Sequence, residues 1–175
     1  MVATTADMLD FYTDLGKKQQ QGEIKFLSEL CYRDFGVKNL WYLTADFHFI
    51  YLGVHYCIPA GFVLDFYSVP RALRWMFPNN QGVYNESAAI HDFLVRNRKV
   101  LGLSLMECHH AFNAAMDYQD MGSARRRTKF SAVVLFNWMA PGPGDGTPGR
   151  RARKAIAAKK PPNGINFSQI GPKSA

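Results

Sequence analysis

Six polar residues stand inside otherwise apolar stretches of this 175-residue chain, and their side chains are of types that do acid–base or metal chemistry. They are Asp65, Ser68, Arg71, His91, Asp92 and His109. A buried charge without a partner costs several kcal/mol, so each charged group must find a hydrogen-bond partner or a ligand. Imidazoles and carboxylates bind zinc, manganese and iron, and a bound ion polarises a water molecule. The candidate catalytic residues are therefore Asp65, His91, Asp92 and His109, and the candidate metal ligands are His91, Asp92 and His109.

Two predicted helices carry the histidines. In ESAAIHDFLVR, either His91 or Asp92 must face the interior if Ala88 and Val95 do, because these positions lie on neighbouring ridges of a helix. On the next helix, His109 shares a side with Leu105, Phe112 and Met116, whereas His110 is expected to meet water. We expect the two helices to present these side chains to the loop that holds Asp65.

The same residues also suit a structural polar network, made of Asp65, Ser68, Arg71, His91 and Asp92. In IPAGFVLDFYSVPR, the planar guanidinium of Arg71 can satisfy both oxygens of Asp65, and Ser68 can cap the turn before Pro70. The metal interpretation lacks an HExxH motif or a second histidine at helical spacing from His91. We therefore favour the network and keep the metal site as the alternative.

The elements that must position these residues predict an α+β fold. Residues 1–22 are expected to form an amphipathic docking helix with Met8, Phe11, Tyr12 and Leu15 on one side. Within 23–140, aromatic and β-branched runs predict a small antiparallel sheet, and a cluster of three to four helices follows. One of these helices opens with a Ser104–Glu107 capping box. The last is expected to place Thr128, Ala132, Leu135, Phe136 and Met139 along one face.

The positive charge is concentrated near the end of the chain. The net charge is +7, yet residues 1–140 hold 14 Lys or Arg against 13 Asp or Glu. Residues 141–175 hold seven cations against Asp145 alone, together with six prolines and six glycines, which predicts an extended arm. Its expected partner-binding residues are Arg150, Arg151, Arg153, Lys154, Lys159 and Lys160.

Neither a membrane span nor a secretion signal is expected. No run of about 18 uncharged apolar residues exists, and the N-terminal stretch carries acids where a signal would be basic and then apolar. We expect a protein without membrane insertion that is made and kept in a cytoplasm. The three cysteines, Cys31, Cys57 and Cys108, form no CxxC pair and are expected to be reduced thiols in the core.

The chain contains three blocks, which are in order GFxxDFxSVPR around Asp65, AAxHDxL around His91 and a later helix bearing Phe112. Together these blocks resemble a bacteriophage and prophage family known only as a domain of unknown function. The resemblance covers about residues 40–140 and implies a protein encoded among phage tail and lysis genes. Three positions depart from the family pattern. Leu64 stands where a small hydroxyl residue is usual, Val95 replaces an aromatic residue, and His109 replaces an aspartate.

The expected function is a structural component of a tailed-phage virion, in its tail, baseplate or tail-tip region. It would be assembled in the bacterial host cytoplasm and contact other virion proteins through residues 1–22 and 141–175. An enzyme is less expected, and no cofactor is required. The alternative is a small metal-dependent hydrolase that acts on the host envelope during entry or lysis, with a divalent metal held by Asp65, His91, Asp92 and His109. A third expectation is non-specific nucleic-acid binding by the basic arm, which would depend strongly on salt.

Overall fold

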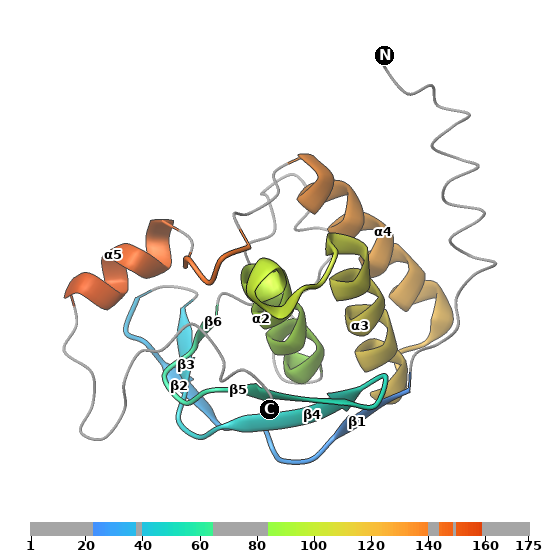
Figure 1. The fold of residues 1–175 in the computed structure, drawn as a ribbon, viewed down its shortest axis with the longest axis horizontal. Coiled ribbons are helices and arrows are strands. Elements are labelled where there is room, and N and C mark those ends of the chain that lie inside the picture. The colour runs from blue at the N-terminus through green and yellow to red at the C-terminus, as the bar shows by residue number, and fades with distance from the viewer. Residues whose placement is uncertain (1–22, 38–39, 65–83, 140–143, 149, 159–175) are drawn as a thin grey trace.

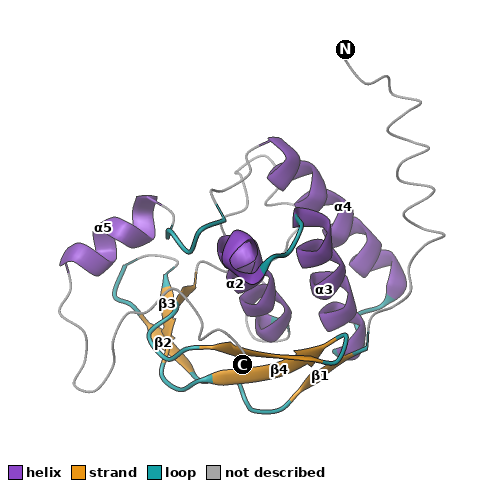
Figure 2. Ribbon diagram, in the orientation of Figure 1, coloured by secondary structure: helices purple, strands orange, loops and turns teal. Residues whose placement is uncertain are grey.

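The computed structural model describes residues 23–37, 40–64, 84–139, 144–148 and 150–158. The predicted helix within residues 1–22 and the turn with Asp65, Ser68 and Arg71 lie outside these ranges. Two three-stranded antiparallel sheets come first along the chain, and helices follow, so the fold is α+β as predicted (Figure 2). In Figure 1 the helices α2, α3 and α4 lie on one side of the strands, as a second layer.

Sheet A contains β1 (Ile24–Phe26), β4 (Phe47–Tyr51) and β5 (Val54–Ile58), in the order β1-β4-β5. Tyr51 pairs with Val54, which leaves Leu52 and Gly53 as a two-residue hairpin turn. Both have positive φ, 50° and 77°, as a turn that follows the twist of the strands requires. Sheet B contains β2 (Tyr32–Asp34), β3 (Trp41–Leu43) and β6 (Val63–Leu64), in the order β2-β3-β6.

The main core lies between sheet A and the first two described helices. Alternate residues of β4 point to it, namely Phe47, Phe49 and Tyr51, as expected for a strand with one buried face. They pack with Ile90 and Phe93 from α2 (Asn85–Leu101) and with a run of small residues on α3 (Leu105–Tyr118). These small residues are Ala111, Ala114 and Ala115, and they let helix α3 approach the strands closely.

The ends of these two helices follow from the sequence. The predicted capping box of α3 is confirmed: the Ser104 N–H donates to Glu107 Oε2 at 2.7 Å, and the Glu107 N–H donates to Ser104 Oγ at 3.2 Å. Helix α2 ends at Gly102, which has a φ of 71° and donates its N–H to the Arg98 carbonyl.

Helix α4 (Ser123–Met139) packs on α3, and Ala132 of the predicted face is buried. Phe130 and Val134 are buried in a cluster with Phe112 and Met116, whereas Thr128 and Leu135 are exposed. The prediction for Thr128 and Leu135 was wrong because several faces of this helix carry apolar residues, and the position of α3 decides which one is covered.

The segment expected to be an extended arm contains a helix, α5 (Arg150–Ala158). Its buried residues, Ala152 and Ala155, pack with Phe35, Leu40, Tyr42 and Val63 beside sheet B. Residues 150–158 contain no proline or glycine and consist mostly of good helix formers, so this stretch differs from the composition of the whole segment. The expectation of an extended arm is therefore corrected for these nine residues.

Residues 144–148 connect α5 to the helical layer through two backbone hydrogen bonds. The Lys99 N–H donates to the Gly144 carbonyl and the Gly146 N–H donates to the Arg96 carbonyl, both at 2.8 Å. Among the described helices, none combines the length and the apolar character that crossing a membrane requires.

Candidate functional site

Helices α2 and α3 bring His91 and His109 together. His91 Nε2 lies 3.1 Å from His109 Nδ1, and the two ring centroids are 5.3 Å apart with 21° between the ring planes. The side chains are 9% and 1% exposed, and the ring of Phe112 lies 4.9 Å from that of His91. The predicted inward orientation of His109 is confirmed. Of the adjacent pair His91 and Asp92, the histidine is buried and the aspartate is half-buried.

The hydrogen bond between the rings requires at least one neutral imidazole, because one nitrogen must donate a proton and the other must accept it. Burial, together with a smaller contribution from the neighbouring His109, lowers the pKa of His91 to about 3. Burial also lowers the pKa of His109 to about 4, with a smaller contribution from His110. Both rings are therefore neutral near pH 7.

The second ring nitrogen of His109, Nε2, is buried and has no hydrogen-bond partner among the described residues. It presents either an N–H or a lone pair to the interior, according to the tautomer. His110 Nε2 is also buried without a partner within the described part of the chain, and its ring lies 6.3 Å from that of Phe130. The expectation that His110 meets water is therefore wrong for this atom.

Of the remaining residues of the predicted network, the structure describes only Asp92. Asp65, Ser68 and Arg71 lie outside the described residues, so the bonds expected between them stay predictions. The strand that leads to Asp65 is attached to the helix of His91, because Arg96 Nη1 of α2 donates to the Val63 carbonyl of β6 at 2.8 Å.

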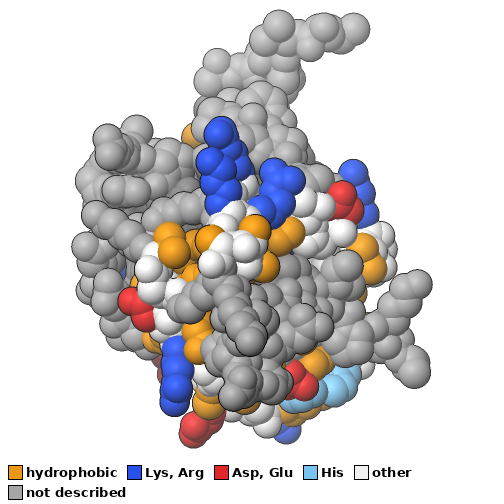
Figure 3. Space-filling model, turned by 90° about the vertical axis from the view of Figure 1, so that its left-hand side faces the viewer, with side chains coloured by type: hydrophobic (Ala, Val, Ile, Leu, Met, Phe, Trp, Pro, Cys, Tyr) orange, Lys and Arg blue, Asp and Glu red, His pale blue; other side chains and the backbone are white. Residues whose placement is uncertain are grey.

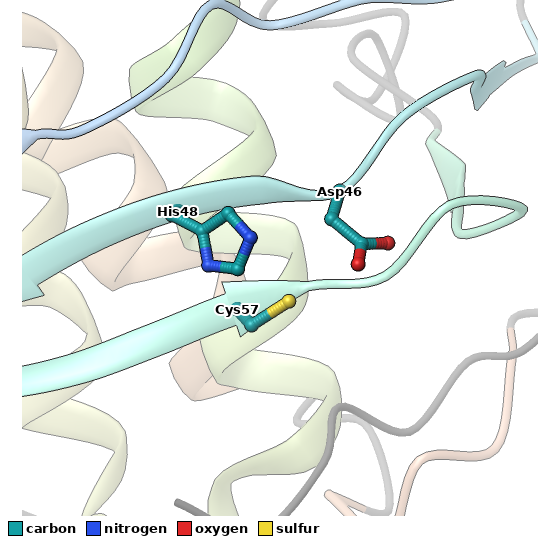
Figure 4. A group of neighbouring side chains, drawn as sticks. All are labelled: Asp46, His48 and Cys57. Carbon is teal, nitrogen blue, oxygen red and sulfur yellow. The ribbon is translucent and has the colours of Figure 1, made fainter.

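A second group of chemically active side chains lies on β4 and β5, and the sequence analysis missed it. Asp46, His48 and Cys57 place one possible ligand atom each within 4.8 Å of the others (Figure 4). The signal was present in the sequence, since Asp46 directly precedes β4 and is two residues from His48, a spacing that places side chains on the same face of an extended chain. The position of Cys57 opposite His48 depends on strand register, which the sequence analysis did not assign.

The cysteines differ from the expectation of core thiols in two of three cases. Cys108 is buried, as expected, whereas Cys31 is exposed and Cys57 is half-buried. The pKa of the Cys57 thiol is raised from its usual value, first by burial and then by the charge of Asp46.

Three of the six predicted partner-binding cations lie on α5 with described side chains. Arg150, Arg153 and Lys154 are exposed, on the side of the helix that Ala152 and Ala155 do not occupy. Figure 3 views the molecule from the side of α5, and basic side chains gather over this helix. Arg151 also belongs to α5, and Lys159 and Lys160 lie outside the described residues.

Comparison with known proteins places the chain in a family. Residues 41–133 match the family described as "Protein of unknown function (DUF1353)", which is more than half of the chain. No curated protein and no solved structure matches it. The matched region runs from β3 into α4 and includes both the His91–His109 pair and the group of Asp46, His48 and Cys57. The chain is thus a member of the DUF1353 family.

Proposed function

We propose that this protein is a non-enzymatic structural component of a tailed-bacteriophage virion, in the tail, baseplate or tail-tip region. The GFxxDFxSVPR and AAxHDxL motifs support the phage origin through their resemblance to phage and prophage proteins. Assembly would take place in the bacterial host cytoplasm. The neighbours would be other virion proteins, bound through residues 1–22 and through the basic C-terminal segment.

The observation that carries the structural role is the arrangement of α5. Its apolar residues are buried against sheet B, so the helix is fixed to the body, while Arg150, Arg153 and Lys154 remain exposed. A basic surface held on a rigid element suits an acidic partner better than a free arm, because less conformational entropy is lost on binding. Nucleic acid is a second possible partner of the same cations.

The buried histidines fit this proposal. His91 and His109 satisfy one another by a hydrogen bond between two packed helices, which is how a polar group in a core is stabilised. In the structural role, the pair ties α2 to α3 and fixes the position of both helices under the sheet.

The test is the composition of purified phage particles that encode this chain. Quantitative mass spectrometry should find the protein in a constant ratio to known tail proteins, and the ratio should survive a high-salt wash and repeated gradient purification. Absence from particles, with abundant protein in the infected cell, would contradict the proposal.

A metal-dependent hydrolase of the host envelope is the second candidate, favoured by the two facing imidazole nitrogens. Two nitrogens bound to one tetrahedral zinc ion at about 2.05 Å are about 3.3 Å apart, close to the observed 3.1 Å. Neutral rings are the form that binds metal.

Metal analysis separates the two candidates. If the hydrolase is correct, purified tag-free protein should contain a divalent metal that His91→Ala removes and that Cys31→Ala, a change at an exposed ligand-type side chain away from His91, retains. Equal metal content in the two variants would contradict the hydrolase and leave the structural role as the explanation of the pair.

A further inference from the structure

The outer face of sheet A holds a group of side chains that the proposed function does not use. Phe47, Phe49 and Tyr51 of β4 point to the helices, so His48 between them points to the opposite side of the sheet. In the antiparallel register His48 lies directly opposite Cys57 of β5. The group is thus separated by the sheet from the His91–His109 pair.

Three ligand types converge here. A carboxylate oxygen of Asp46, an imidazole nitrogen of His48 and the sulfur of Cys57 all lie within 4.8 Å of one another. Figure 4 shows the Asp46 carboxylate and the Cys57 sulfur turned to the same side of the His48 ring. Asp46 is exposed and the other two are half-buried, so an ion can enter from solvent.

The carboxylate of Asp46 is already oriented by the backbone. The Ala60 N–H donates to Asp46 Oδ1 at 2.7 Å, while the other carboxylate oxygen is not used by this bond. A metal-binding carboxylate is commonly held by such a hydrogen bond, because it fixes the direction of the free oxygen.

The ring of His48 is oriented in the same way by a second histidine. His48 Nδ1 lies 3.1 Å from His55 Nε2, with the ring centroids 5.2 Å apart. When His48 Nδ1 donates its proton to His55, the lone pair of His48 is on Nε2. Figure 4 shows this nitrogen facing Asp46 and Cys57, whereas Nδ1 faces away from them.

We propose that Asp46, His48 and Cys57 bind a zinc-class divalent cation, and that His55 is the positioning residue for His48. A set with one thiolate, one imidazole and one carboxylate favours zinc over magnesium or calcium, which prefer oxygen ligands alone. Three protein ligands leave a fourth tetrahedral position for water or for a group of a bound partner. The inference does not depend on the virion proposal, since it concerns the outer face of the sheet alone.

The first experiment titrates cobalt(II) into the tag-free full-length protein. Cobalt occupies zinc sites, and a thiolate ligand adds a charge-transfer absorption band in the near ultraviolet to the visible bands of a tetrahedral site. We expect both, with an end point of one ion per chain and reversal by added zinc. A titration without the charge-transfer band overturns the proposal.

Variants identify the ligands. Cys57→Ser should abolish the charge-transfer band, whereas Cys31→Ser, a matched change at an exposed cysteine outside the group, should retain it. Asp46→Asn and His48→Asn should weaken binding, and His55→Asn should weaken it by about 10- to 100-fold, the usual effect of removing a residue that orients a ligand. A band that survives Cys57→Ser, or that is lost in Cys31→Ser, contradicts the proposed site.

A second measurement needs no variant. Zinc should slow the alkylation of Cys57 by iodoacetamide in the wild-type protein, while Cys31 in the same chain serves as the internal control. Peptide mass spectrometry reads the two sites separately. Equal alkylation rates at Cys57 with and without zinc would overturn the proposal, whether or not any variant folds.

Discussion

At the scale of single residues, the buried pair of His91 and His109 links stability to pH. The folded state holds both rings neutral because they are buried, whereas the unfolded chain lets them protonate near pH 6.5. When the pKa of a group is lower in the folded state than in the unfolded chain, only the unfolded chain binds the proton at a pH between the two pKa values. The folded protein therefore loses stability as the pH falls below the pKa of the unfolded chain. For histidine this loss begins near neutral pH.

We therefore predict that the free energy of unfolding decreases between about pH 6.5 and pH 4, where the folded His109 begins to protonate. Each of the two histidines contributes a slope of about 1.4 kcal/mol per pH unit over this range. Urea unfolding of His91→Gln, followed by circular dichroism, should give a slope that is shallower by that amount. Val100→Gln, at an exposed position on the same helix, should keep the wild-type slope, and equal slopes in wild type and His91→Gln would contradict the prediction.

Gly144 is a second position where one residue matters. Its φ is 77°, and a Cβ atom there would lie 2.5 Å from Arg98 Nη1 and 2.8 Å from Arg98 Cγ. We predict that Gly144→Ala lowers the free energy of unfolding by roughly 1–2 kcal/mol from the backbone alone, with a further cost for moving Arg98. Gly122→Ala is the control, because a Cβ atom at Gly122 meets nothing within 4 Å. Equal stabilities of the two variants in urea unfolding would show that the segment at Gly144 is not held against α2.

At the scale of elements, α5 shows how a short helix can be both anchored and available for binding. Ala152 and Ala155 are 2% and 7% exposed and pack beside sheet B, while Arg153 and Lys154 between them face solvent. A nine-residue helix is marginal by itself in water, so its stability here depends on this packing. The basic surface therefore exists in a defined position only as long as α5 stays docked.

Because α5 depends on this packing, a charged residue on its buried side should detach it, whereas a charged residue on its exposed side should not. Ala155→Asp should detach the helix, because a carboxylate would be buried in an apolar cluster, and trypsin should then cleave after Arg153 and Lys154 several times faster. Ala157→Asp is the matched control, since Ala157 is exposed on the same helix. Cleavage at the same rate in the two variants would mean that the packing of α5 does not protect these bonds.

At the scale of the whole molecule, charge and apolar packing are separated. Residues 1–140 are nearly balanced, and the surplus of positive charge lies in residues 141–175. A balanced body with a basic extension suits association with an acidic surface, which steers the encounter without disturbing the core.

If the protein has the proposed virion role, the double change Arg153→Glu and Lys154→Glu should lower its incorporation into phage particles roughly tenfold or more, which corresponds to a loss of at least about 1.4 kcal/mol of binding free energy. Lys25→Glu with Arg33→Glu changes the net charge equally at exposed positions on β1 and β2, and it should have little effect. Quantitative mass spectrometry of purified particles measures both. Equal incorporation of the two double variants would contradict a role for α5 in assembly.

Local patterns predicted the elements well. The antiparallel strands predicted from aromatic and β-branched runs, the capping box at Ser104 and the inward side of His109 each depend on neighbours within a few residues, and the structure confirms them. The expected arm was wrong for residues 150–158 because the proline and glycine content of the whole segment hid a nine-residue helix. The predicted burial of Cys31 was wrong because the burial of a side chain depends on elements distant in the chain, which apolar neighbours in sequence do not determine.

By itself, the sequence determined the α+β order of elements, the start of helix α3 and the histidines that the two helices could bring together, because hydrophobic period and capping chemistry act over short distances. Only the tertiary structure decided that His91 bonds to His109, that Cys57 lies opposite His48, and that α5 covers sheet B. Each of these contacts joins residues far apart in the chain or in different strands, so it depends on register and packing, which no local pattern specifies.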